Sequence, residues 1–169
     1  GGNYGNSFSV NNATKSLLTT KPLDREDYAL YQLTITMWNN TGKAGETSLN
    51  VKVLDKNDNK PKFKDPELTI RIVENMLTGV SIGQVTAEDA DEPGSNSHIT
   101  YTMSSFQGNR YIALDSSTGQ LSLKESISYE TVSSLTFEVI AKDGGSPQLS
   151  STATVYLVVY DIPETVVER

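Results

Sequence analysis

The 169-residue chain carries 21 acidic and 14 basic residues, giving a formal net charge of −7, and it contains no cysteine. The charge excludes an electrostatic surface for nucleic acid, and the missing thiols exclude a disulfide scaffold, cysteine-based zinc sites and thiol catalysis. The single histidine, His98, leaves no material for a histidine-dependent triad and is expected to be a solvated loop residue. The longest apolar run, residues 155–160, is far shorter than the roughly 20 residues that a membrane-spanning helix needs, so no membrane insertion is expected.

Alternating apolar residues predict half-buried strands along the chain, because successive side chains of a strand point to opposite faces. Turn-forming residues separate these segments at intervals of about 8 to 12 residues, which is typical of all-β sandwiches, and no segment has a convincing helical period. We therefore expect antiparallel sheets with Greek-key connections. In chain order the clearest strands lie at 31–37, 49–53, 68–72, 99–103, 121–123, 135–141 and 153–159.

The chain contains one module used twice. Ile112 falls on Phe8 and Phe137 falls on Leu33, a shift of 104 residues that holds without gaps for more than thirty residues. We expect residues 1–62 to be the C-terminal part of one repeat with its linker, and residues 63–169 to be a complete repeat. The predicted fold class is all-β, as tandem seven-stranded Greek-key β-sandwiches whose first repeat is N-terminally incomplete.

Residues 55–63 join the two copies and are rich in side chains that offer oxygen ligands. A simple polar turn is an open alternative for this segment in isolation, because Asn, Asp and Pro are common turn residues. Further acidic groups lie at strand ends or in loops, the positions that gather at the poles of a sandwich. In a head-to-tail pair of sandwiches, seven carboxylates would meet at the linker: Asp24, Glu26, Asp55, Asp58, Asp89, Asp91 and Asp143.

Such a set of carboxylates requires bound cations. Two carboxylates roughly 4 Å apart repel by about 4 kcal/mol at an effective dielectric constant near 20. Ligand sets made only of oxygen select hard divalent ions, and irregular loops suit Ca²⁺ better than octahedral Mg²⁺. Up to three Ca²⁺ ions would bring six positive charges against the seven carboxylates. An EF-hand is excluded, because Lys60 stands where that loop needs glycine and no helices flank it.

At these residues the sequence resembles the cadherin superfamily of tandem extracellular repeats. The matching motifs are Asp55 to Phe63, Leu23 to Glu26, Asp89 to Asp91 and Ala141 to Asp143, in the order that the family has them. The resemblance implies an immunoglobulin-like sandwich and up to three Ca²⁺ ions between successive repeats, which stiffen them into a rod. The metal ligands that it implies are Asp24, Glu26, Asp55, Asn57, Asp58, Asn59, Asp89, Asp91, Asn96 and Asp143.

The sequence departs from the family pattern at both ends. Glu74 carries the family's early glutamate in the second copy, whereas the first copy lacks that portion, so only one linker site is complete. At the downstream end Ser128 replaces the aspartate that the first copy has at Asp24, while Glu74, Glu130 and Asp161 persist. We therefore expect a degenerate C-terminal linker with few or no Ca²⁺ ions, and an atypical, long or protocadherin-like cadherin.

The resemblance implies a calcium-dependent cell-adhesion ectodomain fragment on the extracellular side of the membrane, within a larger single-pass membrane protein. Its partner would be a cadherin ectodomain in cis or trans, homophilic or heterophilic. The alternative is a calcium-stabilised β-sandwich that binds carbohydrate or protein without a role in adhesion. An enzyme with paired catalytic carboxylates is least favoured, because the candidates cluster at a linker and not in a cleft.

Other residues have smaller expected roles. The first ten residues lack a secretory signal pattern, so we expect a cytosolic chain or an excised piece, and the resemblance favours the latter. Asn12 and Asn39 each begin an Asn-x-Thr pattern, which makes a glycoprotein plausible. Trp38 is expected to be a structural or surface residue, on the face opposite Leu33.

Overall fold

The computed structural model describes residues 2–163. The chain divides into two compact units, Gly1–Lys56 and Asn57–Arg169, and each is described by itself below. Among the described residues, no helix combines the length and the apolar character needed to cross a bilayer.

The first unit consists of two antiparallel strand pairs and a short 3-10 turn, η1 (Tyr4–Asn6). Strand β1 (Phe8–Asn11) pairs with β2 (Ser16–Thr19), and β3 (Leu30–Asn39) forms a long hairpin with β4 (Gly42–Lys52). Its small core consists of Phe8, Tyr31 and Leu33, and the Phe8 and Tyr31 rings meet edge to face with centroids 4.9 Å apart. This unit therefore forms two ribbons around a minimal apolar centre.

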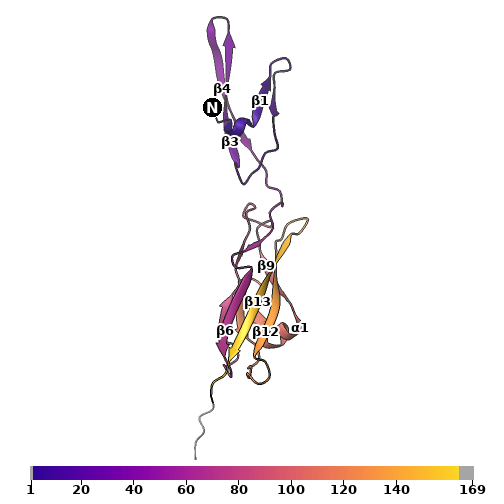
Figure 1. The fold of residues 1–169 in the computed structure, drawn as a ribbon. Coiled ribbons are helices and arrows are strands. Elements are labelled where there is room, and N and C mark those ends of the chain that lie inside the picture. The colour runs from indigo at the N-terminus through magenta and orange to yellow at the C-terminus, as the bar shows by residue number, and fades with distance from the viewer. Residues whose placement is uncertain (1, 164–169) are drawn as a thin grey trace, which may run out of the picture. The chain divides into compact units, whose positions relative to one another are not determined.

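The second unit contains two larger sheets and one short strand pair (Figure 1). The four-stranded sheet has the order β6-β13-β12-β9, with β6 parallel to β13, and the three-stranded sheet has the order β10-β11-β7. Strands β5 and β8 pair with each other beside them. The bounds are β5 (Lys62–Phe63), β6 (Glu67–Val73), β7 (Ser81–Gln84), β8 (Ala87–Glu88), β9 (Thr100–Ser104), α1 (Phe106–Tyr111), β10 (Ile112–Leu114), β11 (Gln120–Leu123), β12 (Ser134–Lys142) and β13 (Ser150–Tyr160).

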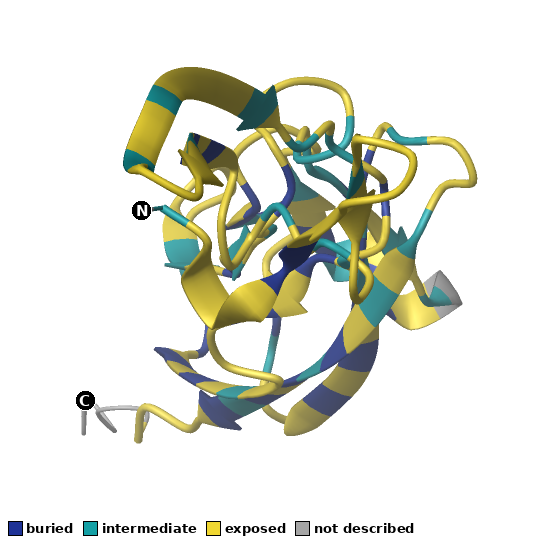
Figure 2. Cartoon of the chain, turned by 90° about the horizontal axis from the view of Figure 1, so that it is seen from above, coloured by how far each residue is buried: buried dark blue, intermediate teal, exposed yellow. Residues whose placement is uncertain are grey.

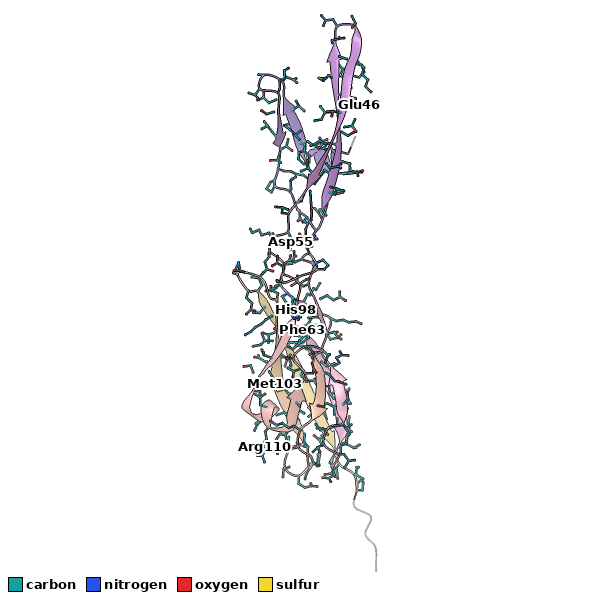
Figure 3. All side chains as sticks on the ribbon, turned by 180° about the vertical axis from the view of Figure 1, so that it is seen from behind. Glu46, Asp55, Phe63, His98, Met103 and Arg110 are labelled. Atoms are coloured by element: carbon teal, nitrogen blue, oxygen red, sulfur yellow. The ribbon has the colours of Figure 1, made fainter. Side chains whose placement is uncertain are left out.

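The core of the second unit follows the alternating pattern of its strands. Buried and exposed residues alternate along β12 and β13, which appear as banded strands in Figure 2. Val139, Val155 and Leu157 are completely inaccessible to solvent, and Phe63 of β5 packs against the same core (Figure 3). The prediction of an all-β fold with two main sheets of seven strands is confirmed for this unit, since its two larger sheets contain four and three strands. The expectation that both sheets are purely antiparallel is wrong for the four-stranded sheet, because β6 runs parallel to β13 at its edge.

Two local features differ from the sequence expectations. The helix α1 was not anticipated, because six residues are too few to show a helical period; the Ser105 side chain caps it by accepting a hydrogen bond from the Gly108 N–H. Met37, which continues the apolar side of β3, is 61% exposed because the hairpin extends beyond the small core and the strand register shifts after this residue. Trp38 is 73% exposed, so it is a surface residue.

Candidate metal centre

Asn57 fastens the start of the second unit to the loop that follows β12. Its Nδ2 donates to Asp143 Oδ2 at 3.1 Å and to the Pro147 carbonyl at 2.7 Å. Both partners are acceptors, so the amide nitrogen must face them, and this fixes the orientation of the amide oxygen. That oxygen, Oδ1, is buried and has no hydrogen-bond partner among the described residues.

Asp143, which accepts one of these hydrogen bonds, is buried, with 1% of its surface exposed. Its Oδ1 accepts hydrogen bonds from the N–H groups of Gly145 (3.0 Å) and Leu149 (3.1 Å), and the Leu149 N–H also reaches Oδ2 at 3.1 Å. Together with the amide of Asn57, these donors compensate a large part of the cost of burying the carboxylate.

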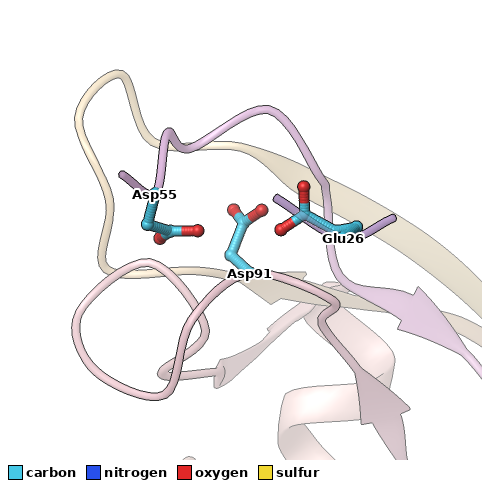
Figure 4. A group of neighbouring side chains, drawn as sticks. All are labelled: Glu26, Asp55 and Asp91. Carbon is cyan, nitrogen blue, oxygen red and sulfur yellow. The ribbon is translucent and has the colours of Figure 1, made fainter. Parts of the chain in front are cut away.

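Asp91 lies in the loop between β8 and β9 and is 3% exposed. Its Oδ1 accepts a hydrogen bond from Asn59 Nδ2 at 2.8 Å, and its backbone N–H donates to Asp89 Oδ1 at 3.0 Å. Its second oxygen, Oδ2, is buried without a hydrogen-bond partner among the described residues. The Asp91 side chain is drawn in Figure 4, where it projects from its loop.

The two remaining predicted ligands of the second unit, Asp58 and Asn96, are less buried than Asp91 and Asp143. Asp58 is exposed, and its Oδ1 lies 3.3 Å from Asn59 Nδ2. Asn96 is half-buried in a turn whose neighbour Ser95 accepts the Gly144 N–H at 3.0 Å. That contact ties the loop after β8 to the loop after β12, so the two acidic loops of this unit are connected through the backbone.

The residues of the second unit fit a calcium ion. Buried polar atoms in native proteins are almost always paired, so two buried unpaired oxygens, Asn57 Oδ1 and Asp91 Oδ2, indicate a missing positive partner. The surrounding side chains are carboxylates and amides, which are the ligands that Ca²⁺ prefers. The metal-ligating role of the predicted set, beyond this fit, remains a prediction.

In the first unit Glu26 and Asp55 contact Arg25, and Asp24 lies in the same turn. Asp24 Oδ1 accepts the Glu26 N–H at 2.9 Å, which shapes the turn. Arg25 lies 2.5 Å from Glu26 Oε1 through Nη2 and 2.5 Å from Asp55 Oδ1 through Nε. The Glu26 and Asp55 side chains are shown in Figure 4. Burial raises the pKa of Glu26, and Arg25 acts in the opposite direction.

At the downstream end of the second unit, Glu74, Glu130 and Asp161 offer carboxylate oxygens that all lie within 4.8 Å of one another. Glu74 is 6% exposed, and its two oxygens accept the N–H groups of Ile162 and Tyr129, each at 3.0 Å. These backbone hydrogen bonds lower the pKa of Glu74. The three residues that persist at this end are thus brought together, while the expectation of few or no Ca²⁺ ions there stays a prediction.

Sequence reasoning missed two features of these sites. The first is Gly145, at which an added Cβ would lie 2.2 Å from Asn57 Cγ, so only glycine leaves room for the Asn57 amide. The second is the charge contact of Arg25, whose motif was recognised but whose partners were not. Neither has a signature in residue spacing, because both depend on how a loop folds back onto a distant segment.

The other singled-out residues lie on the surface. His98 is exposed, and its N–H donates to the Ser95 carbonyl at 3.2 Å (Figure 3). Asn12 and Asn39 are both exposed. Asn39 Oδ1 accepts hydrogen bonds from the N–H (2.9 Å) and the hydroxyl (2.8 Å) of Thr41, so this Asn-x-Thr pattern forms a compact turn at the end of the β3–β4 hairpin.

The sheets and the oxygen-rich loops define a chain of β-sandwich type with candidate cation ligands at its strand ends. The Cadherin domain family model matches residues 1–54 and 68–160. The chain is 34% identical over 164 residues to the protocadherin-like wing polarity protein stan of Drosophila melanogaster; the match covers 96% of this chain and 5% of that protein. The chain therefore spans a small part of the length of this relative.

Solved structures agree with the family match. The crystal structure of human CDH23 EC21-23 matches with a TM-score of 0.84 and 36% identity, covering 92% of this chain and 51% of that one. Extracellular cadherin domains 3-6 of protocadherin Gamma B2 match with a TM-score of 0.83 and 26% identity, covering 90% and 39%. The chain belongs to the cadherin family, and its relatives are of the non-classical type. Cadherins are adhesion proteins and not enzymes.

Proposed function

We propose that this chain is part of a calcium-dependent cell-adhesion ectodomain, in which Ca²⁺ bound at the inter-repeat linker stiffens the connection between consecutive repeats. In this proposal residues 1–62 are the later part of one cadherin repeat with its linker, and residues 63–169 are a complete repeat. Support comes from the family, whose domains bind Ca²⁺ at such linkers, and from the similarity to the extracellular cadherin domains of protocadherin Gamma B2.

The observation that carries the proposal is the pair of buried, unpaired oxygens on Asn57 and Asp91. These two residues, with Asp89, Asp143 and the carbonyl groups of Asn59 and Asn96, would hold one ion. When bound, the ion supplies the positive charge that buried carboxylates require.

The protein's own residues prepare this site. Asn57 is held against the loop after β12 by two hydrogen bonds, and Asn59 is held against the loop after β8 by one. A cation that bound oxygens from these residues would join the linker to both loops. The sites nearer the first repeat would use Asp24, Glu26, Asp55 and Asp58, so that up to three ions occupy the linker.

The proposed location is the extracellular side of the cell membrane, within a larger single-pass membrane protein. The proposed partner is a cadherin ectodomain, in cis or in trans. Stiffening matters for such contacts because a flexible connection between repeats would spend binding free energy on ordering.

The test is calcium-dependent stability of the chain and of two matched variants. At about 1 mM Ca²⁺ and a dissociation constant near 0.1 mM, one site would add about 1.4 kcal/mol to the free energy of unfolding. We expect Asp91→Asn to raise stability in chelator, because it removes a buried charge with an unpaired oxygen, and to lower the gain from Ca²⁺. Asp143→Asn should also lower the gain from Ca²⁺. In contrast to Asp91→Asn, it should destabilise the chain in chelator, because it places an amide against N–H donors.

Glu46→Gln is the control, since Glu46 is an exposed carboxylate paired with Lys43 on the β3–β4 hairpin (Figure 3). It should leave the calcium response unchanged. Equal melting temperatures, equal molecular lengths from small-angle scattering and equal protease resistance in chelator and in about 1 mM Ca²⁺ would contradict the proposed function.

A further inference from the structure

Arg25 occupies the position of a cation between two predicted calcium ligands of the first unit. Its guanidinium group lies 2.5 Å from Glu26 Oε1 and 2.5 Å from Asp55 Oδ1. The three side chains are 15%, 24% and 11% exposed, so water screens this contact less than it screens a pair on an open surface. One positive group therefore bridges the turn after β2 and the segment after β4.

The distances place Arg25 where it would compete with Ca²⁺ for these oxygens. Calcium takes oxygen ligands at about 2.3–2.6 Å, the same range in which the guanidinium nitrogens lie. A divalent ion coordinated by the same Glu26 and Asp55 oxygens would lie within a few ångströms of the guanidinium charge and repel it. Binding of the metal there would therefore favour movement of Arg25 away from these oxygens.

The second repeat supplies an internal comparison. The shift of 104 residues places Tyr129 at the position of Arg25 and Glu130 at that of Glu26. The tyrosine brings no positive charge to Glu130 and Asp161, whereas its backbone N–H donates to Glu74. Within this chain, the first copy has an arginine at this position and the second copy has a tyrosine.

We propose that Arg25 is a built-in counter-ion that competes with calcium for Glu26 and Asp55. It holds the end of the first unit together when calcium is absent, and it raises the calcium concentration that is needed to occupy these carboxylates. The proposal rests on the proposed calcium-binding function and adds a residue that tunes it. The proposal predicts two effects of Arg25: it raises the stability of the calcium-free state, and it lowers the affinity for calcium. A purely structural arginine would support both states.

The test is peptide-resolved hydrogen exchange of the whole chain, wild type against Arg25→Gln, in chelator and across a calcium titration. The reporters are the Tyr28 N–H, bonded to the Asp24 carbonyl at 3.1 Å, and the Val53 N–H, bonded to the Ala29 carbonyl at 2.9 Å. We expect Arg25→Gln to exchange faster at these amides in chelator. We also expect its calcium midpoint for protection to fall roughly two- to fivefold, the factor that a partly exposed ion pair supports.

Arg110→Gln is the matched control, since Arg110 pairs with Glu125 at 3.2 Å on an exposed surface of the second unit. It should change neither the exchange nor the midpoint at the reporter amides. Protection by calcium in both proteins, with an equal or higher midpoint in Arg25→Gln, overturns the counter-ion role and leaves the calcium function standing. The absence of any calcium-dependent protection at these amides in either protein overturns the proposed function of this end together with the competition.

Discussion

Gly145 is the residue whose replacement tests the arrangement around Asn57 most directly. A Cβ added at Gly145 would lie 2.2 Å from Asn57 Cγ, 2.3 Å from Oδ1 and 2.4 Å from Nδ2. Ordinary contacts of this kind are 3.4–4 Å long, so the Asn57 side chain or the loop must move. The φ angle of Gly145 lies outside the left-handed region, which means that alanine is unfavourable here because of Asn57 and not because of the backbone.

The cost of Gly145→Ala can be bounded in two ways. If Asn57 swings out, the chain loses its hydrogen bonds to the Asp143 side chain and to the Pro147 carbonyl, about 2–4 kcal/mol together. If the loop shifts, overpacking costs about 1–3 kcal/mol. We therefore expect a loss of about 2 kcal/mol in chelator, which lowers the melting temperature by roughly 8–12 °C. Calcium affinity should fall roughly tenfold or more, since Asn57 is a proposed ligand.

The assay is a double-mutant cycle by urea unfolding in chelator, with Asn57→Ala as the second substitution. Asn57→Ala removes the three atoms that the new Cβ would meet, so Gly145→Ala should cost under about 0.5 kcal/mol in that background. The difference between the two backgrounds is then the coupling between the residues. Equal costs of Gly145→Ala in both backgrounds would refute the reasoning, because the glycine would then be required for a reason unrelated to Asn57.

Three further outcomes follow from described contacts. The Ser117 hydroxyl and the N–H groups of Thr118 and Ser117 lower the pKa of Asp115. The stabilisation by this carboxylate is therefore complete above the unfolded pKa of about 3.9 and is lost as the pH falls from there through the lower folded pKa. The gap in unfolding free energy between wild type and Asp115→Ala should narrow from pH 6 to pH 3. Expression in a secretory eukaryotic host should add an N-glycan at Asn39, seen as a mass shift that Asn39→Gln removes, and an unglycosylated chain would contradict this. Glu130→Gln should leave the calorimetric calcium stoichiometry unchanged, because the downstream set lacks an aspartate at Ser128, and loss of one ion would show that this end is a working site.

The long strands of the second unit were predictable because a half-buried strand alternates apolar and polar residues along the sequence. The alternation of apolar residues located β6, β12 and β13, whose burial patterns follow it. The pair β5–β8 and the helix α1 were not predictable in this way, since two to six residues do not complete enough periods to separate strand, helix and turn. In the first unit the same rule misplaced Met37, because alternation identifies a face and does not say where the core beneath that face ends.

The acidic residues at the linker were identifiable as candidates, but their different roles were not. Asp143 and Asp91 have the same side chain and nearly the same burial, and the sequence assigned both to metal. The structure separates them by their donors. Backbone N–H groups and the Asn57 amide surround Asp143, so this carboxylate can be buried before any ion arrives. Asp91 receives one side-chain donor on Oδ1, and its Oδ2 is left unpaired.

This division indicates an order of events at the proposed site. The hydrogen bonds of Asp143 and Asn57 form with the fold, because they use only groups of the protein, and they fix the Asn57 oxygen in place before the ion binds. The unpaired oxygen of Asp91 costs free energy until a cation compensates it. In the proposed function, this site would form its own hydrogen bonds without calcium and would gain stability when calcium binds. Calcium would then compensate Asp91 Oδ2, the oxygen that donors in the described part of the second unit leave unpaired.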